Sequence, residues 1–353
     1  MIKSSDSLSQ ILKALLDGRS TAADWQKLGQ LELANPRQAS AFNLTTTNVE
    51  AQLQQRAKLL RLTYSAFWEV CDRHLGNPEW FLPTLWQFWL PLAQRLIQQR
   101  QAIGRPLIQG VLGGQGTGKT TLGIMLSTIL QTLGYNTLSW SLDDLYKTYA
   151  DRLQLQQQIP ELIWRGPPGT HDVELGLQVL DQLRHAQPNP PFAVPRFDKS
   201  LHNGMGDRVA PEFVQDMDVV LFEGWFMGVQ PIEPIAFTHP PAPIQTEADR
   251  AFAQACNDRL SAYLPLWQQL DSLWVLYLPD YRLSKQWRQQ AEAKMKASGK
   301  SGMSDVEIDV FVEYFWKALH PDLFIRPTLA QADLVIEINS DHSLGEMYCF
   351  HRT

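Results

Sequence analysis

The sequence is poor in cysteine, has no long apolar run and shows no excess of basic residues. Its three cysteines, Cys71, Cys256 and Cys349, are far apart and odd in number, which argues against a disulfide framework or a zinc site. No stretch reaches the roughly 18 apolar residues of a membrane span. The first residues also lack the apolar core and cleavage site of a secretion signal. We therefore expect a cytoplasmic protein that does not contact a membrane.

The charge balance excludes a further class of partner. The net charge is −6 at pH 7, and the sequence lacks the basic stripe that nucleic-acid binding requires. We therefore expect no nucleic-acid partner. The 353 residues suffice for one large α/β domain with an appendage, or for two domains.

Residues 1–103 are predicted to form an N-terminal helical region. Apolar residues recur there at helical spacing: Leu8, Ile11, Leu12 and Leu15, then Leu59, Leu60, Leu62, Phe67 and Val70. The apolar stretch 86–96 predicts a buried or half-buried helix. The region carries no chemical motif, and three roles are open: bracing a sheet, forming a subunit contact or covering a nucleotide.

From residue 104 to 353 the pattern predicts a second domain, in which short apolar strands alternate with helices. Strands are expected at 107–112, 135–142, 218–222, 273–278 and 333–338. Helices are expected at about 119–133, 172–186, 247–270, 281–297 and 304–318, with 187–246 mostly loop around its one strand. The order strand, loop, helix, strand predicts a three-layer α/β/α arrangement with a mostly parallel sheet.

A glycine-rich loop follows the first of these strands. The segment 113–120 fits the pattern G-x-x-x-x-G-K-[ST] at every fixed position. Glycines let several backbone N–H groups turn toward one polyphosphate, and the helix that begins here adds its positive end. Lys119 would reach the β- and γ-phosphates, and Thr120 would bind Mg²⁺. The predicted ATP contacts are Gly113, Gly114, Gln115, Gly116, Thr117, Gly118, Lys119, Thr120 and Thr121.

The strand before this loop and the helix after it supply the context of a P-loop NTPase domain. A chance match to the pattern would not require that context. A dinucleotide fingerprint G-x-G-x-x-G is excluded, because it would need a glycine at Lys119 or at Thr121.

Acidic residues end two further strands. In an open parallel sheet the carboxyl ends of the strands face the ligand. Asp143 is predicted to be the carboxylate that takes the proton of an acceptor hydroxyl. Asp144 either contacts the substrate or caps the following turn. Glu223 is predicted to bind Mg²⁺, as the acid of a Walker B strand does.

These residues together resemble the phosphoribulokinase/uridine kinase/pantothenate kinase superfamily, and within it the D-glycerate 3-kinases of the plant and cyanobacterial type. The segments that carry the resemblance are 141–149, 165–172, 195–208, 221–228 and 287–315. The strings RGPPGTHD and PRFDKSLHNG are the most specific of them. The resemblance implies conversion of ATP and D-glycerate to ADP and 3-phosphoglycerate, in photorespiratory recovery of glycerate. It also implies that Asp143 is the catalytic aspartate and Glu223 the Walker B acid.

A small substrate with one carboxylate calls for a cation in its pocket, best a guanidinium. The predicted substrate contacts are Asp144 at a strand end and, in predicted loops, Arg165, His171, Arg196, Asp198 and Lys199, with Arg208 as a further cation there. Each has another interpretation. His171 could simply begin a helix, Arg196 and Asp198 could form a local ion pair, and the remaining cations could be surface charges.

A basic helix near the C-terminal part of the domain is predicted to act as a lid, about 281–303. It carries Arg282, Lys285, Arg288, Lys294 and Lys296, and a Gly/Ser-rich hinge follows at 298–302. Arg282 and Arg288 are predicted to reach the ATP phosphates and stabilise the charge of phosphoryl transfer. The alternative is a basic helix face that only meets solvent.

Two other functions stay open at this point. One is a kinase of another small alcohol, such as pantothenate or a nucleoside. The other is an ATP-dependent switch without a small substrate, which would not need Asp143 or a cluster of loop cations. Only the resemblance selects the 3-hydroxyl over the 2-hydroxyl.

Overall fold

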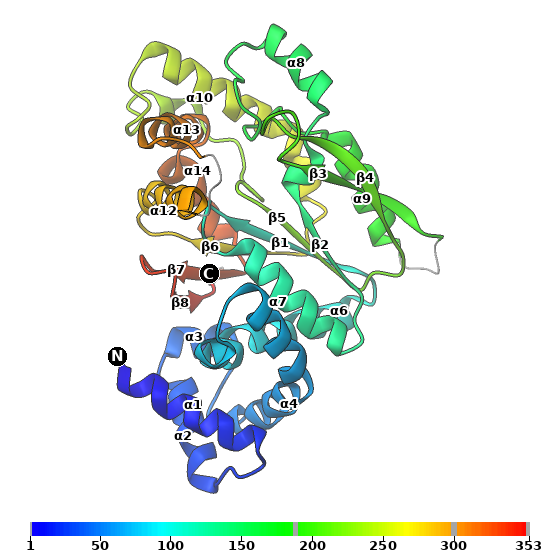
Figure 1. Ribbon diagram of the computed structural model, residues 1–353, viewed down its shortest axis with the longest axis vertical. Coiled ribbons are helices and arrows are strands. Elements are labelled where there is room, and N and C mark those ends of the chain that lie inside the picture. Colours follow the sequence, from blue (N-terminus) through cyan, green and yellow to red (C-terminus); the bar gives the residue numbers. More distant parts are fainter. Residues whose placement is uncertain (1, 186–189, 298–301, 351–353) are drawn as a thin grey trace.

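A six-stranded sheet lies at the centre of the molecule, seen in a computed structural model that describes residues 2–185, 190–297 and 302–350 (Figure 1). Its strand order is β2-β5-β1-β6-β7-β8. The strands are β1 (Leu107–Gly113), β2 (Thr137–Ser141), β5 (Val219–Gly224), β6 (Ser272–Tyr277), β7 (Leu334–Ile338) and β8 (Leu344–Tyr348). All pairs are parallel except β7 with β8. The predicted α/β/α class with a mostly parallel sheet is confirmed.

Helices cover both faces of this sheet, which is why β1 is buried along its whole length. Leu107 and Val111 face a core shared with α7 (Lys119–Thr132) and the N-terminal helices. Ile108 and Leu112 face the opposite core. The helices of that side are α9 (Val173–Arg184), α10 (Glu247–Leu260), α11 (Leu264–Trp267), α13 (Asp305–Ala318) and α14 (Pro321–Thr328).

The N-terminal region is helical, as predicted. It contains α1 (Ile2–Leu16), α2 (Ala22–Leu33), α3 (Pro36–Ala41), α4 (Val49–His74), η1 (Pro78–Phe81), α5 (Leu82–Thr84), η2 (Leu85–Trp89) and α6 (Leu90–Ile103). The expected buried helix over 86–96 is confirmed by η2 and α6. Leu12, Leu60 and Trp86 belong to the same core as strand residues of the sheet. Of the three roles left open, this packing supports bracing of the sheet, and the boundary at 103/104 stays a prediction.

Most of the described residues in 187–246 lie in loops, as expected, but the sequence analysis missed a pair of strands there. A hairpin of β3 (Phe192–Asp198) and β4 (Asp207–Val214) projects from the sheet (Figure 1). The sequence analysis did not predict strand β3 because it contains Pro195, and proline cannot donate a backbone hydrogen bond to a neighbouring strand. The pairing shifts register between Val194 and Arg196, so Pro195 occupies a bulge. The single short helix between this hairpin and α10 is η4 (Pro234–Phe237), within the described residues.

Other departures have local causes. The helix expected over 247–270 is divided by η5 (Ser261–Tyr263). Helix α11 begins at Leu264, and Pro265 in its first turn has no N–H to continue the helix before it. The second strand ends at Ser141, where the 3-10 turn η3 (Leu142–Leu145) begins. Helices α8 (Tyr149–Gln158) and α14, the turn η6 (Leu329–Gln331) and strand β8 had no prediction.

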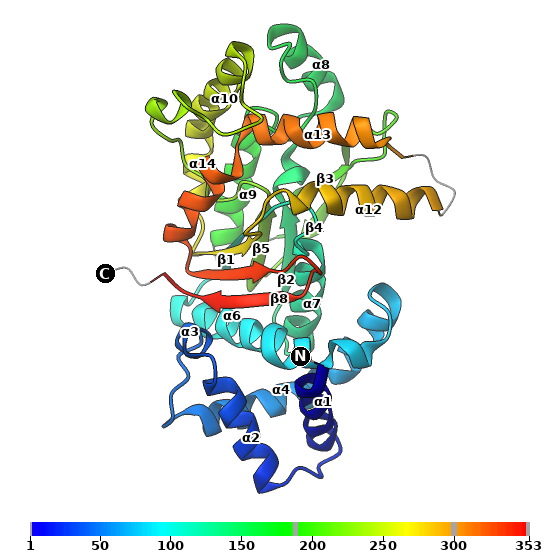
Figure 2. The same ribbon diagram turned by 90° about the vertical axis from the view of Figure 1, so that its left-hand side faces the viewer.

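The helix α12 (Leu283–Ala297) runs beside α13 along the side of the molecule shown in Figure 2. Lys285 joins the two helices through ion pairs to Asp309 and Glu313. Positions 298–301 of the predicted hinge lie outside the described residues. No helix in the described ranges combines the length and the apolar character that crossing a membrane requires. All three cysteines are free, as expected.

Candidate active site

The phosphate loop joins the end of β1 to the start of α7. The Thr117 hydroxyl donates to the Gly114 carbonyl oxygen at 2.8 Å, and Lys119 Nζ donates to the same oxygen at 3.1 Å. Gly116 and Gly118 have φ angles of 81° and 88°, which residues with a Cβ rarely adopt. The predicted contacts 113–121 therefore form one turn at the carboxyl end of β1, with Thr120 and Thr121 in the first turn of α7.

Two aromatic residues that sequence reasoning missed pack on this loop. Trp287 of α12 lies so close that a Cβ built at Gly116 would be 2.8 Å from its ring. His342, in the turn between β7 and β8, stacks on Trp287 with ring centroids 4.0 Å apart, and its Nδ1 lies 3.3 Å from the Gly116 carbonyl oxygen. Trp287 is the first residue of the segment 287–315, one of those that carry the family resemblance. The sequence analysis could therefore have singled it out. Nothing in the local sequence marks His342.

Lys119 faces the acid at the end of β5. Its Nζ lies 3.8 Å from Glu223 Oε2, and both side chains line one small hollow with Ser139. Burial lowers the pKa of Lys119, although Glu223 and Asp143 act in the opposite direction. The predicted phosphate lysine and the predicted Walker B acid are thus neighbours beside the loop.

Asp143 lies in η3, directly after β2, and pairs with Lys199. The distance between Lys199 Nζ and Asp143 Oδ2 is 2.6 Å. Burial acts to raise the pKa of Asp143, but the Lys199 ammonium and the Tyr146 hydroxyl outweigh it and lower that pKa. Asp143 is therefore ionised at neutral pH, as a proton acceptor must be.

Asp144 has a different environment from its neighbour. Its carboxylate completes the capping box with Ser141, accepts the Phe197 backbone N–H at 3.1 Å and pairs with Arg196 at 2.9 Å. Arg196 also pairs with Glu212 of β4. The capping alternative for Asp144 is thus realised, and the Asp144–Arg196 pair joins η3 to the hairpin. A substrate contact by either residue stays a prediction.

The expectation that Arg196, Asp198 and Arg208 lie in loops is wrong, since they lie on β3 and β4. Asp198 accepts hydrogen bonds from the backbone N–H and hydroxyl of Ser200, so the alternative of an Arg196–Asp198 pair is not realised. Arg208 donates to the Tyr146 carbonyl oxygen and to Asp172. These contacts hold the hairpin against the segment after Asp143.

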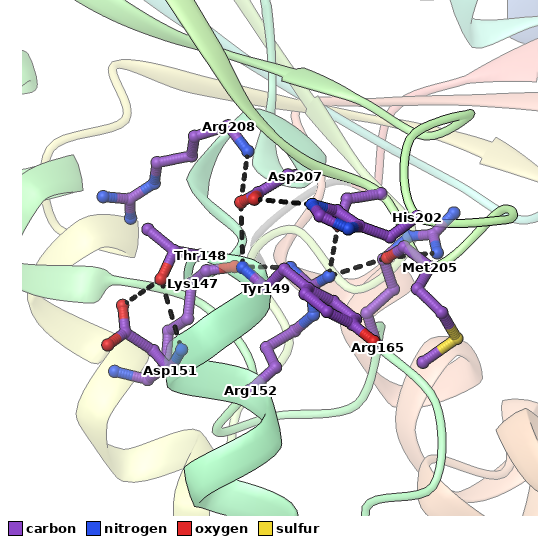
Figure 3. A network of polar contacts seen from close by, with 11 residues as sticks. Lys147, Thr148, Tyr149, Asp151, Arg152, Arg165, His202, Met205, Asp207 and Arg208 are labelled. Carbon is purple, nitrogen blue, oxygen red and sulfur yellow. Dashed lines mark hydrogen bonds and ion pairs between the residues drawn. The ribbon is translucent and has the colours of Figure 1, made fainter.

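Arg165 is occupied by backbone and aromatic groups. It donates to the carbonyl oxygen of Met205 at 3.0 Å (Figure 3) and to that of Gly204 at 2.7 Å. Its guanidinium lies over the rings of Tyr146 and Phe197. Both carbonyls belong to the tip of the hairpin, the turn 199–206. Arg165 thus positions this tip, and its predicted contact with the substrate stays a prediction.

His171 is buried, with 2% of its surface exposed. It stacks on Tyr146, and its Nδ1 lies 2.8 Å from the Tyr263 hydroxyl. Burial lowers the pKa of His171 to about 3, so the ring is neutral at physiological pH. Its Nε2 has no hydrogen-bond partner among the described residues, which leaves one buried polar atom available on the ring.

The two predicted lid arginines point to other partners. Arg282 is exposed and pairs with Asp280, and Arg288 pairs with Glu292 at 2.5 Å and lies over the Phe311 ring. Neither forms a hydrogen bond or ion pair with the phosphate loop within the described residues. Outside the loop backbone, the predicted site residues that interact with one another beside the phosphate loop are Lys119, Asp143, Lys199 and Glu223.

The chain resembles known kinases in sequence and in structure. It is 32% identical to the chloroplastic D-glycerate 3-kinase of Arabidopsis thaliana over 249 residues, 67% of this chain but only 53% of that protein, so it spans about half of that relative's length. It is 32% identical to the uncharacterized kinase mug58 of Schizosaccharomyces pombe over 62% of this chain and 82% of that protein. No model of a protein family matches the chain.

A solved structure also resembles the chain. The D-glycerate 3-kinase from Cryptococcus neoformans superimposes with a TM-score of 0.65 at 28% identity, over 74% of this chain and 99% of that one. The fold and the phosphate loop with its strand-end carboxylates are those of a P-loop kinase. The chain belongs to the D-glycerate 3-kinase-like family of P-loop kinases.

Proposed function

We propose that the protein transfers the γ-phosphoryl group of ATP to the 3-hydroxyl of D-glycerate, in photorespiratory glycerate recovery. The observation that carries the proposal is the Asp143–Lys199 pair beside Lys119. A carboxylate for the substrate hydroxyl and an ammonium for the substrate carboxylate lie in contact there. The names of the Arabidopsis and Cryptococcus relatives support the same substrate.

Each residue of the site has a proposed role. The backbone N–H groups of the loop bind the phosphates, and Lys119 stabilises charge on the transferred group. Asp143 orients the acceptor hydroxyl and takes its proton. Lys199 binds the substrate carboxylate, and the free Nε2 of His171 offers a further hydrogen bond.

Magnesium fits the residues beside the loop. Mg²⁺ prefers oxygen ligands and keeps several of its waters. Thr120 offers a hydroxyl and Glu223 a carboxylate, while no cluster of three His, Cys, Asp or Glu residues in the described part of the chain could hold a metal alone. We therefore assign Thr120 and Glu223 to a Mg²⁺ that shares its coordination with ATP and water. When bound, the ion neutralises phosphate charge.

The lid function of α12 is part of the proposal. Arg282 and Arg288 would reach the phosphates only after leaving Asp280 and Glu292. Closure of such an element excludes water and completes a site. Trp287 already ties α12 to the loop at Gly116, so the movement would turn the helix about this contact.

The substrate is tested with ADP release on a panel of glycerate, pantothenate and a nucleoside. We expect glycerate to give the highest rate, and phosphorus NMR of the product to show the ester at the 3-position. A glycerate rate equal to the blank without acceptor contradicts the proposal. Activity with pantothenate or the nucleoside alone would select the other kinase.

Asp143→Asn tests the chemical role of the acid. Loss of the proton acceptor is expected to lower turnover about 10²- to 10⁴-fold, while ATP binding measured by calorimetry is retained. Asp181→Asn, on the exposed face of α9, is the matched control and should turn over like the wild type. Normal turnover in Asp143→Asn removes Asp143 from its role.

A further inference from the structure

The Asp143 carboxylate is paired with a cation of the protein itself. Lys199 Nζ lies 2.6 Å from Asp143 Oδ2, and the Asp143 side chain is 26% exposed. An acceptor hydroxyl needs a carboxylate oxygen within hydrogen-bonding reach. Lys199 therefore stands where a hydroxyl or a water molecule would have to approach that oxygen.

The backbone beneath Lys199 is held firmly, while its side chain is not. Arg165 and Arg152 together donate to the carbonyl oxygens of Gly204, Met205 and Gly206 in the hairpin tip (Figure 3). Lys199, in contrast, has 60% of its side chain exposed. Lysine carries four rotatable methylenes and a compact charge. The ammonium can thus leave Asp143 by rotation of its own side chain, without movement of the tip.

A second clamp fixes the same tip on the side of α8. His202 stacks on Tyr149 with ring centroids 4.1 Å apart, and its Nε2 lies 3.1 Å from Asp207 Oδ2. Asp207 also accepts the backbone N–H of Tyr149 (Figure 3). The turn holding His202 and Asn203 is left-handed, with φ angles of 50° and 57°. The tip is thus anchored from two sides, which fixes the backbone that carries Lys199.

Lys199 can leave Asp143 at low cost only if both charges find new partners. Moving Lys199 away leaves Asp143, a partly buried carboxylate, without its counterion, and an unpaired charge of this kind is unfavourable. Water and neutral alcohols can accept hydrogen bonds from the displaced ammonium but offer it no negative charge. A hydroxy acid offers its carboxylate to Lys199 and its hydroxyl to Asp143, so that each charge keeps a partner.

We propose that Lys199 blocks the catalytic carboxylate until the carboxylate of a hydroxy acid draws it away, and so prevents phosphoryl transfer to water. The inference rests on the proposed function and adds a selection step to it. In the permitted reaction the acceptor oxygen bonds to the γ-phosphorus as the bond to the β,γ-bridging oxygen breaks. The acceptor proton passes to Asp143 and then to solvent, and ADP leaves. With water as acceptor, the same exchange would yield inorganic phosphate.

Lys199→Met tests the block, because methionine keeps the length of the side chain and removes its charge. ADP release from ATP without acceptor should rise about tenfold above the wild-type background. The preference for glycerate over glycerol, as the ratio of kcat/KM values, should fall at least tenfold. Adding Asp143→Asn to this variant should return the background hydrolysis to the wild-type level.

Two further variants complete the experiment. Lys13→Met removes another exposed lysine from an ion pair, with Glu79, and should leave the background hydrolysis unchanged. Lys199→Arg keeps the charge and should keep the background low. If wild-type enzyme phosphorylates glycerate but Lys199→Met shows unchanged background and unchanged preference, the block is overturned while the proposed function stands. If the wild type does not use glycerate, the proposed function itself fails.

Discussion

The adjacent carboxylates Asp143 and Asp144 have different roles, because their side chains meet different partners. Burial raises the pKa of Asp144 even though Arg196 and backbone donors oppose it. Its partners Arg196 and the backbone N–H of Phe197 lie on β3, and they join η3 to a strand of the hairpin. Asp143 instead has the long, exposed side chain of Lys199 as its ion-pair partner, and its pKa is lowered. One carboxylate is thus committed to the fold, while the other can change partners.

Gly116→Ala is the sharpest test of the phosphate loop. A Cβ at φ 81° is strained by roughly 1–2 kcal/mol, and it would also meet the Trp287 ring at 2.8 Å. We expect ATP affinity, measured by calorimetry, to fall at least tenfold. Gly104→Ala introduces a similar strain at φ 73° in open space, away from the loop. ATP binding that is equally weakened in both variants would contradict a specific role of Gly116.

At the scale of elements, contacts between α10 and α13 secure the side of the molecule opposite the N-terminal helices. Asp249 completes the capping box of α10 with Thr246 and pairs with Lys317 of α13 at 2.7 Å. Burial acts to raise the pKa of Asp249, but the Lys317 ammonium and the N–H donors of the cap lower it far below its usual range. The ionised form of this carboxylate therefore stabilises the native state.

Asp249→Ala should consequently lower the free energy of unfolding by roughly 1–2 kcal/mol at pH 7, as loss of a helix cap does. The native pKa lies below the unfolded pKa of about 4, so the contribution is complete above that value and is lost as the pH falls through the native pKa. Urea unfolding should thus show a difference between wild type and variant that shrinks in acid. Asp24→Ala, in the exposed capping box of α2, should show a smaller loss. A difference independent of pH would contradict the ionic origin.

At the scale of the whole molecule, the N-terminal helices and the sheet share one core. Leu60 of α4 is fully buried in it, and Leu62, two residues on, is 64% exposed. The helices therefore belong to the same folded unit as the sheet, because their apolar face covers one face of that sheet.

Leu60→Ala should destabilise the entire protein in a single transition. Large-to-small changes in a core cost about 2–5 kcal/mol, and the shared core transmits the loss to the sheet. Hydrogen exchange should show faster opening of both α4 and β1. Leu62→Ala should have little effect at either place. Faster exchange confined to the N-terminal helices would show that the two regions open independently.

The sequence by itself determined the features that depend only on residues close together along the chain. The phosphate loop, the strand before it and the helix after it follow from local backbone chemistry and short-range apolar spacing. The acids Asp143 and Glu223 were located because parallel strands bring their carboxyl ends to one edge of a sheet. None of these inferences needs to know what packs against the segment.

Only the tertiary structure decided which partner each cation contacts. Arg165, Arg196 and Lys199 look equivalent in sequence, yet the first two hold the hairpin and the third pairs with Asp143. The hairpin was hidden as well, because Pro195 sits in a bulge whose pairing exists only across two strands. A charged side chain takes its role from partners far away in the chain. Those partners are set by packing, which local sequence patterns do not encode.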